Sequence, residues 1–478
     1  MGHGPQRTPE LQGQLGVAAA PDFSKSLPEA HRTLKVWQVA DGGRPWWRRM
    51  LGFAGPGFLV AVGYMDPGNW ATDLAGGSTF GYSLLWVILA SNLMAMLLQV
   101  LCARMGLVTG RDLAQSCRDY YPRPVAMALW LLCEVAIVAC DLAEVIGSAV
   151  ALQLLFGLPL VMGVLLTGLD VFLLLFLINF GFRKLEALVI TLVATIGLCF
   201  AYNIWLAKPD WGAVVHGALV PGALNEEALV IALGILGATV MPHNLYLHSS
   251  IVQTRAHGRT PEDVRAAIRF NTVDTIGALG LAFLVNGAIL VLAAAVFWKM
   301  GVQVAELNQA HELLQPALGG AAATCFALAL LASGQSSTIT GTLAGQIVME
   351  GFLRIRIQPW LRRLITRMLA IVPAVIIITY TGGEHTVKML VISQVVLSMQ
   401  LPFAIFPLVM ITSSKKHMGQ FVNPTWVKVA GFVICFLITG LNIKLLWDTL
   451  GWEWVAAGLS VMAAFAAWVR WGYTPKAA

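Results

Sequence analysis

Apolar residues gather in runs of about 18 or more positions along most of the chain, with short polar segments between them. A helix of that length crosses the hydrocarbon core of a bilayer, so each run is a candidate membrane span. The predicted spans cover residues 53–77, 83–104, 127–155, 158–180, 185–206, 227–254, 272–298, 318–350, 362–381, 387–412, 426–447 and 453–469. The pattern predicts an all-α polytopic membrane protein, with eleven spans as the alternative if the short last run does not cross.

The first and sixth spans are each interrupted by a proline. Residues 66–69 read Asp-Pro-Gly-Asn, and residues 238–243 read Ala-Thr-Val-Met-Pro-His. Proline lacks a backbone N–H, so the carbonyl four residues earlier, that of Gly63 or Ala238, loses its helical partner. Lipid offers no substitute, and such a break persists only where it lines a cavity or binds something. A matched pair of broken helices is typical of a transporter's substrate site.

Basic residues set the expected orientation. The chain is 58% hydrophobic and 12% charged, and of its 31 Lys and Arg residues all but Lys208, Lys299, Lys388 and Lys444 fall on the side of the amino terminus. Positively charged loops stay in the cytoplasm, so the amino terminus is predicted to be cytoplasmic. This ordered distribution argues against a nucleic-acid partner as the reason for the net charge of +6. The seven cysteines form no CxxC pair, and most are expected to be small buried apolar residues.

Spacing and topology divide the chain into three parts. Residues 1–45 are polar, show no signal peptide, and are expected to form a disordered cytoplasmic tail. Residues 46–450 are expected to form the transporter core, with helices 1–5 at about 53–206, helices 6–10 at about 227–412 and helix 11 at about 426–447. Residues 451–478 are expected to hold a twelfth helix and a short cytoplasmic tail. Five spans followed by five of opposite topology make an inverted repeat, with the two broken helices as counterparts.

The two breaks place similar ligands on facing helices. Beside each freed carbonyl stands a side chain that can bind a cation, Asp66 or Met241, and Asn69 adds a carboxamide oxygen. Oxygen ligands alone suit Mg²⁺ or Ca²⁺, whereas a thioether shifts the preference toward transition metals. A methionine in a membrane helix usually serves packing, but a carboxylate at mid-membrane is costly and functional by default. The set predicts weak binding of a divalent metal of intermediate softness.

Span three carries a stripe of three acids. Glu134, Asp141 and Glu144 are spaced 7 and 3 residues apart, which puts them within about 80° of one another around a helix. Acids in a membrane helix must face protein, water or a cation, and Arg362 and Arg363 at the start of span nine are candidate partners. The stripe is either a structural ion-pair network or part of a proton route.

These motifs resemble the paired signatures of the Nramp family. The similarity covers roughly residues 50–450 and extends to Asp-Leu-Ala-Glu at 141–144, Gly-Gln-Ser-Ser at 334–337 and Ser-Gln at 393–394. Magnesium-transporting relatives depart from the Met-Pro-His pattern, which this chain keeps. The resemblance implies a fold like that of the amino acid/sodium symporters, with ten core helices in two inverted halves, helices 1 and 6 broken, and one or two extra helices at the carboxyl end. It also implies a set of metal ligands: Asp66, Asn69, Met241 and the Ala238 carbonyl, joined in some states by Gln394 and the Gly63 carbonyl.

Bacterial members of the family are proton-coupled manganese transporters. The resemblance therefore implies symport of H⁺ with Mn²⁺, and also with Fe²⁺, Cd²⁺ or Co²⁺, by alternating access across the inner membrane of a bacterium. It implies a proton route from Asp66 toward Asp141 and the rest of the acid stripe, and His243 and His248 are candidate relays because histidine changes charge near neutral pH. Metal ion and proton are the expected substrates and the lipid bilayer the expected surroundings. No cofactor, nucleic-acid partner, obligate protein partner or enzymatic activity is expected.

Two other classes of function remain open. A sodium-coupled amino acid symporter of the same fold would bind its substrate carboxylate at a helix N-terminus, and competition of uptake by Mn²⁺ rather than by an amino acid separates the two. A metal-dependent membrane hydrolase is disfavoured, because the sequence contains neither an HExxH nor a GxSxG motif.

Overall fold

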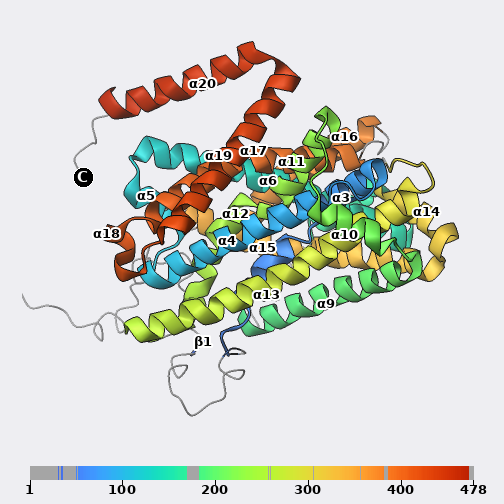
Figure 1. The fold of residues 1–478 in the computed structure, drawn as a ribbon, viewed down its shortest axis with the longest axis horizontal. Coiled ribbons are helices and arrows are strands. Elements are labelled where there is room, and N and C mark those ends of the chain that lie inside the picture. The colour runs from blue at the N-terminus through green and yellow to red at the C-terminus, as the bar shows by residue number, and fades with distance from the viewer. Residues whose placement is uncertain are drawn as a thin grey trace, which may run out of the picture.

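The computed structural model is an elongated bundle of helices that run roughly along its long axis (Figure 1). It describes residues 31, 34–35, 50, 52–169, 182–256, 258, 260–304, 306–355, 357–381 and 386–472. In this part of the chain, the only strands are β1 (Leu34–Lys35) and β2 (Arg255–Ala256), which pair in parallel. The prediction of an all-α protein is therefore confirmed, with one short strand pair added.

The first half of the bundle contains α2 (Pro56–Gly63), α3 (Pro67–Phe80), α4 (Leu85–Thr109), α5 (Leu113–Tyr120), α6 (Arg123–Phe156), α7 (Leu160–Thr167), α9 (Phe182–Ala207) and α10 (Trp211–Leu219). The second half contains α11 (Glu226–Val240), α12 (Pro242–Ile251), η3 (Val252–Thr254), α13 (Pro261–Ala293), η4 (Ala294–Trp298), α14 (Leu307–Leu318), α15 (Gly320–Leu353), α16 (Pro359–Thr381) and α17 (Thr386–Thr412). The carboxyl end contains α18 (Lys415–Met418), η5 (Gly419–Phe421), α19 (Thr425–Leu450), α20 (Trp452–Ala467) and η6 (Trp468–Gly472).

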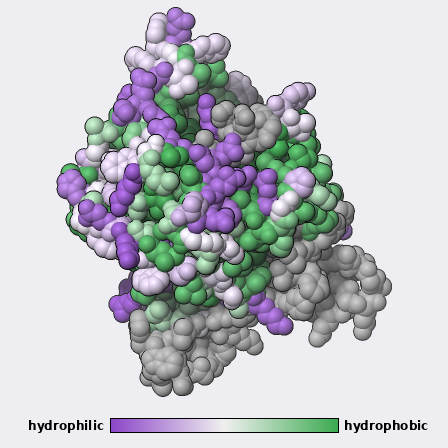
Figure 2. All heavy atoms as spheres, turned by 90° about the vertical axis from the view of Figure 1, so that its right-hand side faces the viewer, coloured by the Kyte–Doolittle hydropathy of each residue, from purple (hydrophilic) through white to green (hydrophobic). Residues whose placement is uncertain are grey.

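A helix begins or continues within every predicted span. Among the described residues, nine helices are long and apolar enough to cross a membrane by themselves. Three of the twelve predicted spans are not among the nine. The first is divided by its break, the fourth runs into residues 170–181, which lie outside the described residues, and the ninth, in α16, carries Arg362, Arg363 and Arg367. On the end face in Figure 2, hydrophilic residues gather across the middle and hydrophobic residues flank them. This distribution suits a bundle whose ends meet water and whose sides meet lipid.

The last helix stands apart from the bundle. α19 packs along α17 and α11, but α20 folds back beside α19 and buries none of its side chains (Figure 1). Its length and hydropathy are sufficient for a span. The division into a tail, a core and a twelfth span stays a prediction, and most of the tail lies outside the described residues.

Both predicted breaks are present. α2 ends at Gly63, and α3 starts at Pro67 after a short turn in which Asp66 has an extended backbone. α11 ends at Val240, and α12 starts at Pro242 after Met241, whose φ of 38° lies in the left-handed region. A side chain beyond Cβ makes this conformation costly, so Met241 is held there by the packing around it. Each proline occupies the first helical position, where its missing N–H has no partner to lose.

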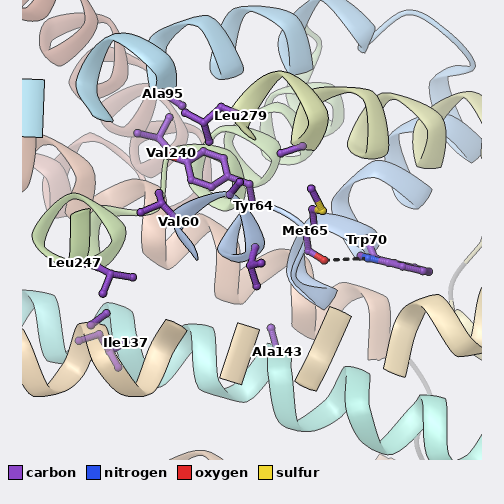
Figure 3. Close-up of a cluster of buried hydrophobic side chains, with 14 of the residues drawn as sticks. Val60, Tyr64, Met65, Trp70, Ala95, Ile137, Ala143, Val240, Leu247 and Leu279 are labelled. Carbon is purple, nitrogen blue, oxygen red and sulfur yellow. Dashed lines mark hydrogen bonds between the residues drawn. The ribbon is translucent and has the colours of Figure 1, made fainter. Parts of the chain in front are cut away.

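The first break is buried in the core of the bundle. Figure 3 shows Tyr64 and Met65 among buried apolar side chains, and Trp70 Nε1 donates to the freed Met65 carbonyl at 3.2 Å. Ser333 of α15 donates to the same carbonyl at 2.5 Å. A Cβ on Gly147 of α6 would lie 2.1 Å from the Pro67 ring, so only glycine lets α6 approach the break. The Met65 carbonyl freed by the break is thus satisfied by one side chain of α3 and one of the neighbouring helix α15.

A charged cluster fixes the start of α2. Asp274 of α13 accepts hydrogen bonds from the amides of Gly57 at 2.7 Å and Gly55 at 3.2 Å. Arg255, which follows the second broken helix, donates to Glu186 of α9 at 2.7 Å and to the Ala54 carbonyl at 2.8 Å. The Arg255 and Glu186 side chains are buried, so their charges are balanced by contact rather than by water.

We expect Glu186→Ala to lower the free energy of unfolding by about 3 kcal/mol, because it removes the carboxylate that balances the buried Arg255 guanidinium. The carboxylate of the nearby Asp274 still interacts with Arg255, so we expect a loss at the low end of the range for a broken buried ion pair. Thermal unfolding in detergent measures the effect, with Glu312→Ala at an exposed glutamate as the matched control. Equal unfolding midpoints for the two variants would contradict this account of the cluster.

Candidate metal site

Asp66 and Asn69 bring the two breaks into contact. Asp66 Oδ1 accepts from the Asn69 amide N at 2.9 Å and from Asn69 Nδ2 at 2.7 Å. Asn69 Nδ2 also donates to the Ala238 carbonyl oxygen at 3.0 Å, across to the other broken helix. The carboxylate, the carboxamide and the freed carbonyl predicted from the sequence therefore lie together.

The Asn69 amide group lies between two oxygens that could both bind a cation. Its two N–H groups bridge an anionic oxygen of Asp66 and the neutral carbonyl oxygen of Ala238. Rotation of the carboxamide by half a turn presents its oxygen instead, so that all three groups become acceptors converging on one point. Hard and borderline divalent cations bind to oxygens arranged in this way.

Asn286 of α13 hydrogen-bonds the side-chain oxygen of Asn69. Its Nδ2 donates to the Asn69 side-chain oxygen at 3.2 Å and to the Tyr64 carbonyl at 2.8 Å. These two bonds tie the orientation of Asn69 to the backbone of the first break. Asn286 was not predicted, because nothing in its local sequence distinguishes it from other polar residues in membrane helices.

Met241 supplies a thioether beside these oxygens. The residue is fully buried, and Asn244 Nδ2 lies 3.4 Å from its sulfur. Asn244 also packs against the end of α2, where a Cβ on Gly63 would lie 2.3 Å from Asn244 Nδ2. The Gly63 carbonyl accepts only a long bond, 3.4 Å, from the Asp66 amide, so it is weakly satisfied by the backbone.

Gln394 of α17 enters between the two broken helices. A Cβ on Gly68 would lie 2.0 Å from Gln394 Nε2, and a Cβ on Gly237 would lie 2.1 Å from the Gln394 backbone oxygen. Glycine at both positions is therefore what allows α17 to come so close. Gln394 Nε2 donates to Ser393 at 3.0 Å, and its Oε1 has no hydrogen-bond partner among the described residues.

The site is closed to solvent in this structure. The side-chain ligands predicted from the sequence have 0–1% of their surface exposed: Asp66, Asn69, Met241 and Gln394. No group of three or more His, Cys, Asp and Glu residues suited to a metal occurs in the part of the chain that the structure describes. A metal ion at the breaks would thus depend on amide, carbonyl and thioether groups around one carboxylate.

The acid stripe of α6 meets a basic stripe of α16. Asp141 Oδ1 lies 2.7 Å from Arg363 and 3.3 Å from Arg367. Glu144 Oε2 lies 3.3 Å from Arg363, 3.4 Å from Arg367, and accepts from Thr338 of α15 at 3.2 Å. Two carboxylates and two guanidiniums, all buried, therefore balance each other. Arg367 was not predicted, although it stands four residues after Arg363 and shares its helix face.

Glu134 and Arg362 form a separate pair, with Glu134 about two turns before Asp141 on α6 and Arg362 directly before Arg363 on α16. Their closest atoms are 3.1 Å apart, and Trp130 Nε1 also donates to Glu134 at 3.1 Å. A Cβ on Gly345 of α15 would lie 2.0 Å from Arg362, so glycine makes room for the guanidinium. The structure thus brings Arg362 and Arg363 to the acids for which they were candidate partners.

The two predicted histidines differ in their surroundings. His248 Nδ1 lies 2.9 Å from Gln99 Oε1, and Gln99 Nε2 donates to the Tyr64 hydroxyl at 2.9 Å. This chain of hydrogen bonds leads from α12 through α4 back to the first break. His243 is buried, and its Nδ1 has no hydrogen-bond partner among the described residues.

Broken helices in two opposed halves, with converging ligands at the breaks, define a membrane transporter of the inverted-repeat class. Residues 57–448 match the Nramp family, described as natural resistance-associated macrophage protein-like. The chain therefore belongs to the Nramp family. Because this is a family of transporters, the expectation that the chain is not an enzyme is confirmed.

Individual relatives agree with this assignment. The chain is 58% identical over 439 residues to the divalent metal cation transporter MntH of Nostoc sp.. The aligned region covers 91% of this chain and 98% of that protein. A manganese transporter of Eremococcus coleocola in complex with an aromatic bis-isothiourea compound shares 40% identity at a TM-score of 0.84, over 93% of this chain and 99% of that chain. Mhp1, a nucleobase-cation-symport-1 family transporter, shares the fold at a TM-score of 0.52 and 15% identity, over 85% of this chain and 93% of that chain.

We expect Gly68→Ala to weaken metal binding at the breaks, because the new methyl group would displace the Gln394 amide. Gly76→Ala is the matched control on the same helix, since its Cβ would lie at an ordinary 3.4 Å from Leu84. Calorimetric titration of both purified variants with Mn²⁺ measures the difference. Equal affinities would show that Gln394 does not contribute to the site.

Proposed function

We propose that this protein is a proton-coupled symporter that imports divalent transition metal ions, Mn²⁺ foremost, by alternating access. The observation that carries the proposal is the single carboxylate of Asp66, enclosed at the junction of two broken helices together with the Asn69 carboxamide, the Ala238 carbonyl and the Met241 thioether. Relatives named as divalent metal cation and manganese transporters support it.

The donor set favours a borderline metal. One anionic oxygen and several neutral oxygens would hold Mg²⁺ or Ca²⁺ only weakly in so small a site, since those ions take six or more oxygen ligands. A thioether adds affinity for softer ions and little for hard ones. Mn²⁺ is the expected main substrate, with Fe²⁺, Co²⁺ and Cd²⁺ as others. Few charged ligands also keep binding weak enough for release.

The acid stripe and its arginines are the proposed proton route. Asp141 and Glu144 lie on the helix that faces the first break, and each is held by two arginines. A carboxylate that takes up a proton here leaves a guanidinium partly unbalanced, but each arginine contacts both acids, so the second carboxylate still balances part of that charge. His243 and the His248–Gln99–Tyr64 chain are further candidates for proton transfer near the metal.

The direction of transport follows from the proposed topology. With the amino terminus in the cytoplasm of a bacterial cell, the proton gradient and the membrane potential both favour inward movement of cations. The alternative of a sodium-coupled amino acid symporter has less support, because the relatives above are named for metals. The N-terminus of α3, where such a substrate carboxylate would bind, is already capped by the Asp66 carboxylate.

The proposal is tested by Mn²⁺ uptake into proteoliposomes with an imposed pH gradient or none. We expect uptake to be faster when the outside is acidic, and to be competed by Cd²⁺ but not by amino acids. Uptake that is equal with and without the gradient would contradict proton coupling, and competition by an amino acid would favour the alternative.

We expect Asp66→Asn to reduce metal uptake to the level of empty vesicles while leaving the protein folded, because it removes the only formal charge placed on the ion. Asn can still accept the α3 capping bond that Asp66 makes. Asp448→Asn, at a solvent-accessible ion pair with Lys444, is the matched control and should transport normally. Uptake by Asp66→Asn near the wild-type rate would remove Asp66 from the site.

We expect Asp141→Asn to separate proton flux from metal flux. Asp141 lies on the acid stripe and not at the breaks, so metal binding should persist while proton entry falls and uptake loses its dependence on external pH. Both fluxes can be followed in the same vesicles with a pH-sensitive dye and a metal-sensitive dye. Undiminished metal-stimulated proton flux would show that the stripe is only a structural network.

A further inference from the structure

The thiol of Cys140 lies between the metal site and the acid stripe. Cys140 is buried on α6, and its Sγ is 3.9 Å from Asp66 Oδ2 and 3.9 Å from Glu144 Oε1. The two oxygens of the Asp66 carboxylate therefore face different surroundings. Oδ1 faces the amide groups of Asn69, and Oδ2 faces a sulfur.

A second sulfur-containing residue packs in the same cluster as Cys140. Cys140 and Met241 pack in one small buried cluster with Ala136 and Leu397. An ion held by Asp66 Oδ2 would therefore lie beside a cluster that contains two sulfur-bearing side chains.

The distance between Asp66 Oδ2 and Cys140 Sγ suits a shared ion. When an ion such as Zn²⁺ lies about 2.1 Å from an oxygen and about 2.3 Å from a sulfur, tetrahedral geometry puts the two ligand atoms about 3.6 Å apart. The observed separation is 3.9 Å, and an ion with longer bonds needs a larger one. No helix would have to move for both atoms to contact the same ion. A thiophilic ion would bind the sulfur as a thiolate, and the thiol proton would pass to the Glu144 carboxylate, whose Oε1 lies 3.9 Å from Sγ.

An independent feature also points to a ligand at this place. Gln394 Oε1 is fully buried and has no hydrogen-bond partner among the described residues. Its amide group lies against Gly68, two residues from Asp66. A buried acceptor without a donor is costly, and a cation at the breaks would satisfy it.

We propose that Cys140 is a specificity-determining residue of the metal site, whose sulfur acts with that of Met241 to favour thiophilic ions such as Cd²⁺ over Mn²⁺. The inference rests on the proposed function of the site as a metal carrier. Sulfur ligands select softer metals, so two of them should bias the site further than one. Cysteine was expected from the sequence to be only a small buried apolar residue, and its neighbours across the helices change that interpretation.

The test uses Cys140→Ser in the full-length protein. Serine is nearly the same size and keeps a hydroxyl that can donate to Asp66, so a purely structural hydrogen bond survives the change. Cys133→Ser is the matched control, because Cys133 is equally buried on α6 but packs in the main core. We expect the ratio of Cd²⁺ to Mn²⁺ uptake to fall on the order of tenfold in Cys140→Ser and to stay at the wild-type value in Cys133→Ser.

X-ray absorption of the Cd²⁺-loaded protein gives a second readout that does not depend on transport. We expect two sulfur neighbours of Cd²⁺ in the wild type, and one in either Cys140→Ser or Met241→Ala. An unchanged uptake ratio, or a single sulfur neighbour in the wild type that Cys140→Ser retains, would overturn the proposal. If the wild type takes up no metal at all, the proposed function fails, whereas the sulfur count still decides the role of Cys140.

Discussion

The arrangement at the centre of this protein depends on how the broken ends of its first helix are satisfied without water. The Asp66 carboxylate caps the amino end of α3 through the Asn69 amide, and the Asn69 side chain connects it to the Ala238 carbonyl of the second break. A helix cap of this kind contributes about 1 kcal/mol, and here it also fixes the position of a charge. The same side chain thus links a requirement of folding to the chemistry of the site, because the cap places its other oxygen toward Cys140.

The second constraint is electrical neutrality inside the bundle. Two carboxylates of α6 face two arginines of α16, and a further pair joins Glu134 to Arg362. Buried charges of this number would destabilise a membrane protein if any lacked a partner. Gly345 on the neighbouring helix α15 keeps the space that the Arg362 head group needs. Packing and charge are therefore matched across three helices.

Local rules predict the breaks and the stripes but not the contacts between them. Proline chemistry alone locates the ends of α2 and α11, and the 100° rotation per residue places Asp141 and Glu144 on one face. The roles of Asn286 and Cys140 could not be predicted, because they depend on which helices are neighbours and at what height, which the order of residues along one helix does not reveal. Arg367 could be predicted in part. Its spacing of four residues from Arg363 places it on the same helix face, but the sequence did not show which acids it contacts.

The bridge made by the Asn69 amide has a consequence for the cycle of a carrier. Its N–H groups hydrogen-bond both the Asp66 and the Ala238 oxygens, so the two breaks are joined by the protein's own groups. A protein that closes only when loaded must exchange one ion for another. One that also closes when empty can reset alone, and each turn then yields net accumulation. A contact between the two breaks is what such a reset requires, and the carboxamide of Asn69 supplies one.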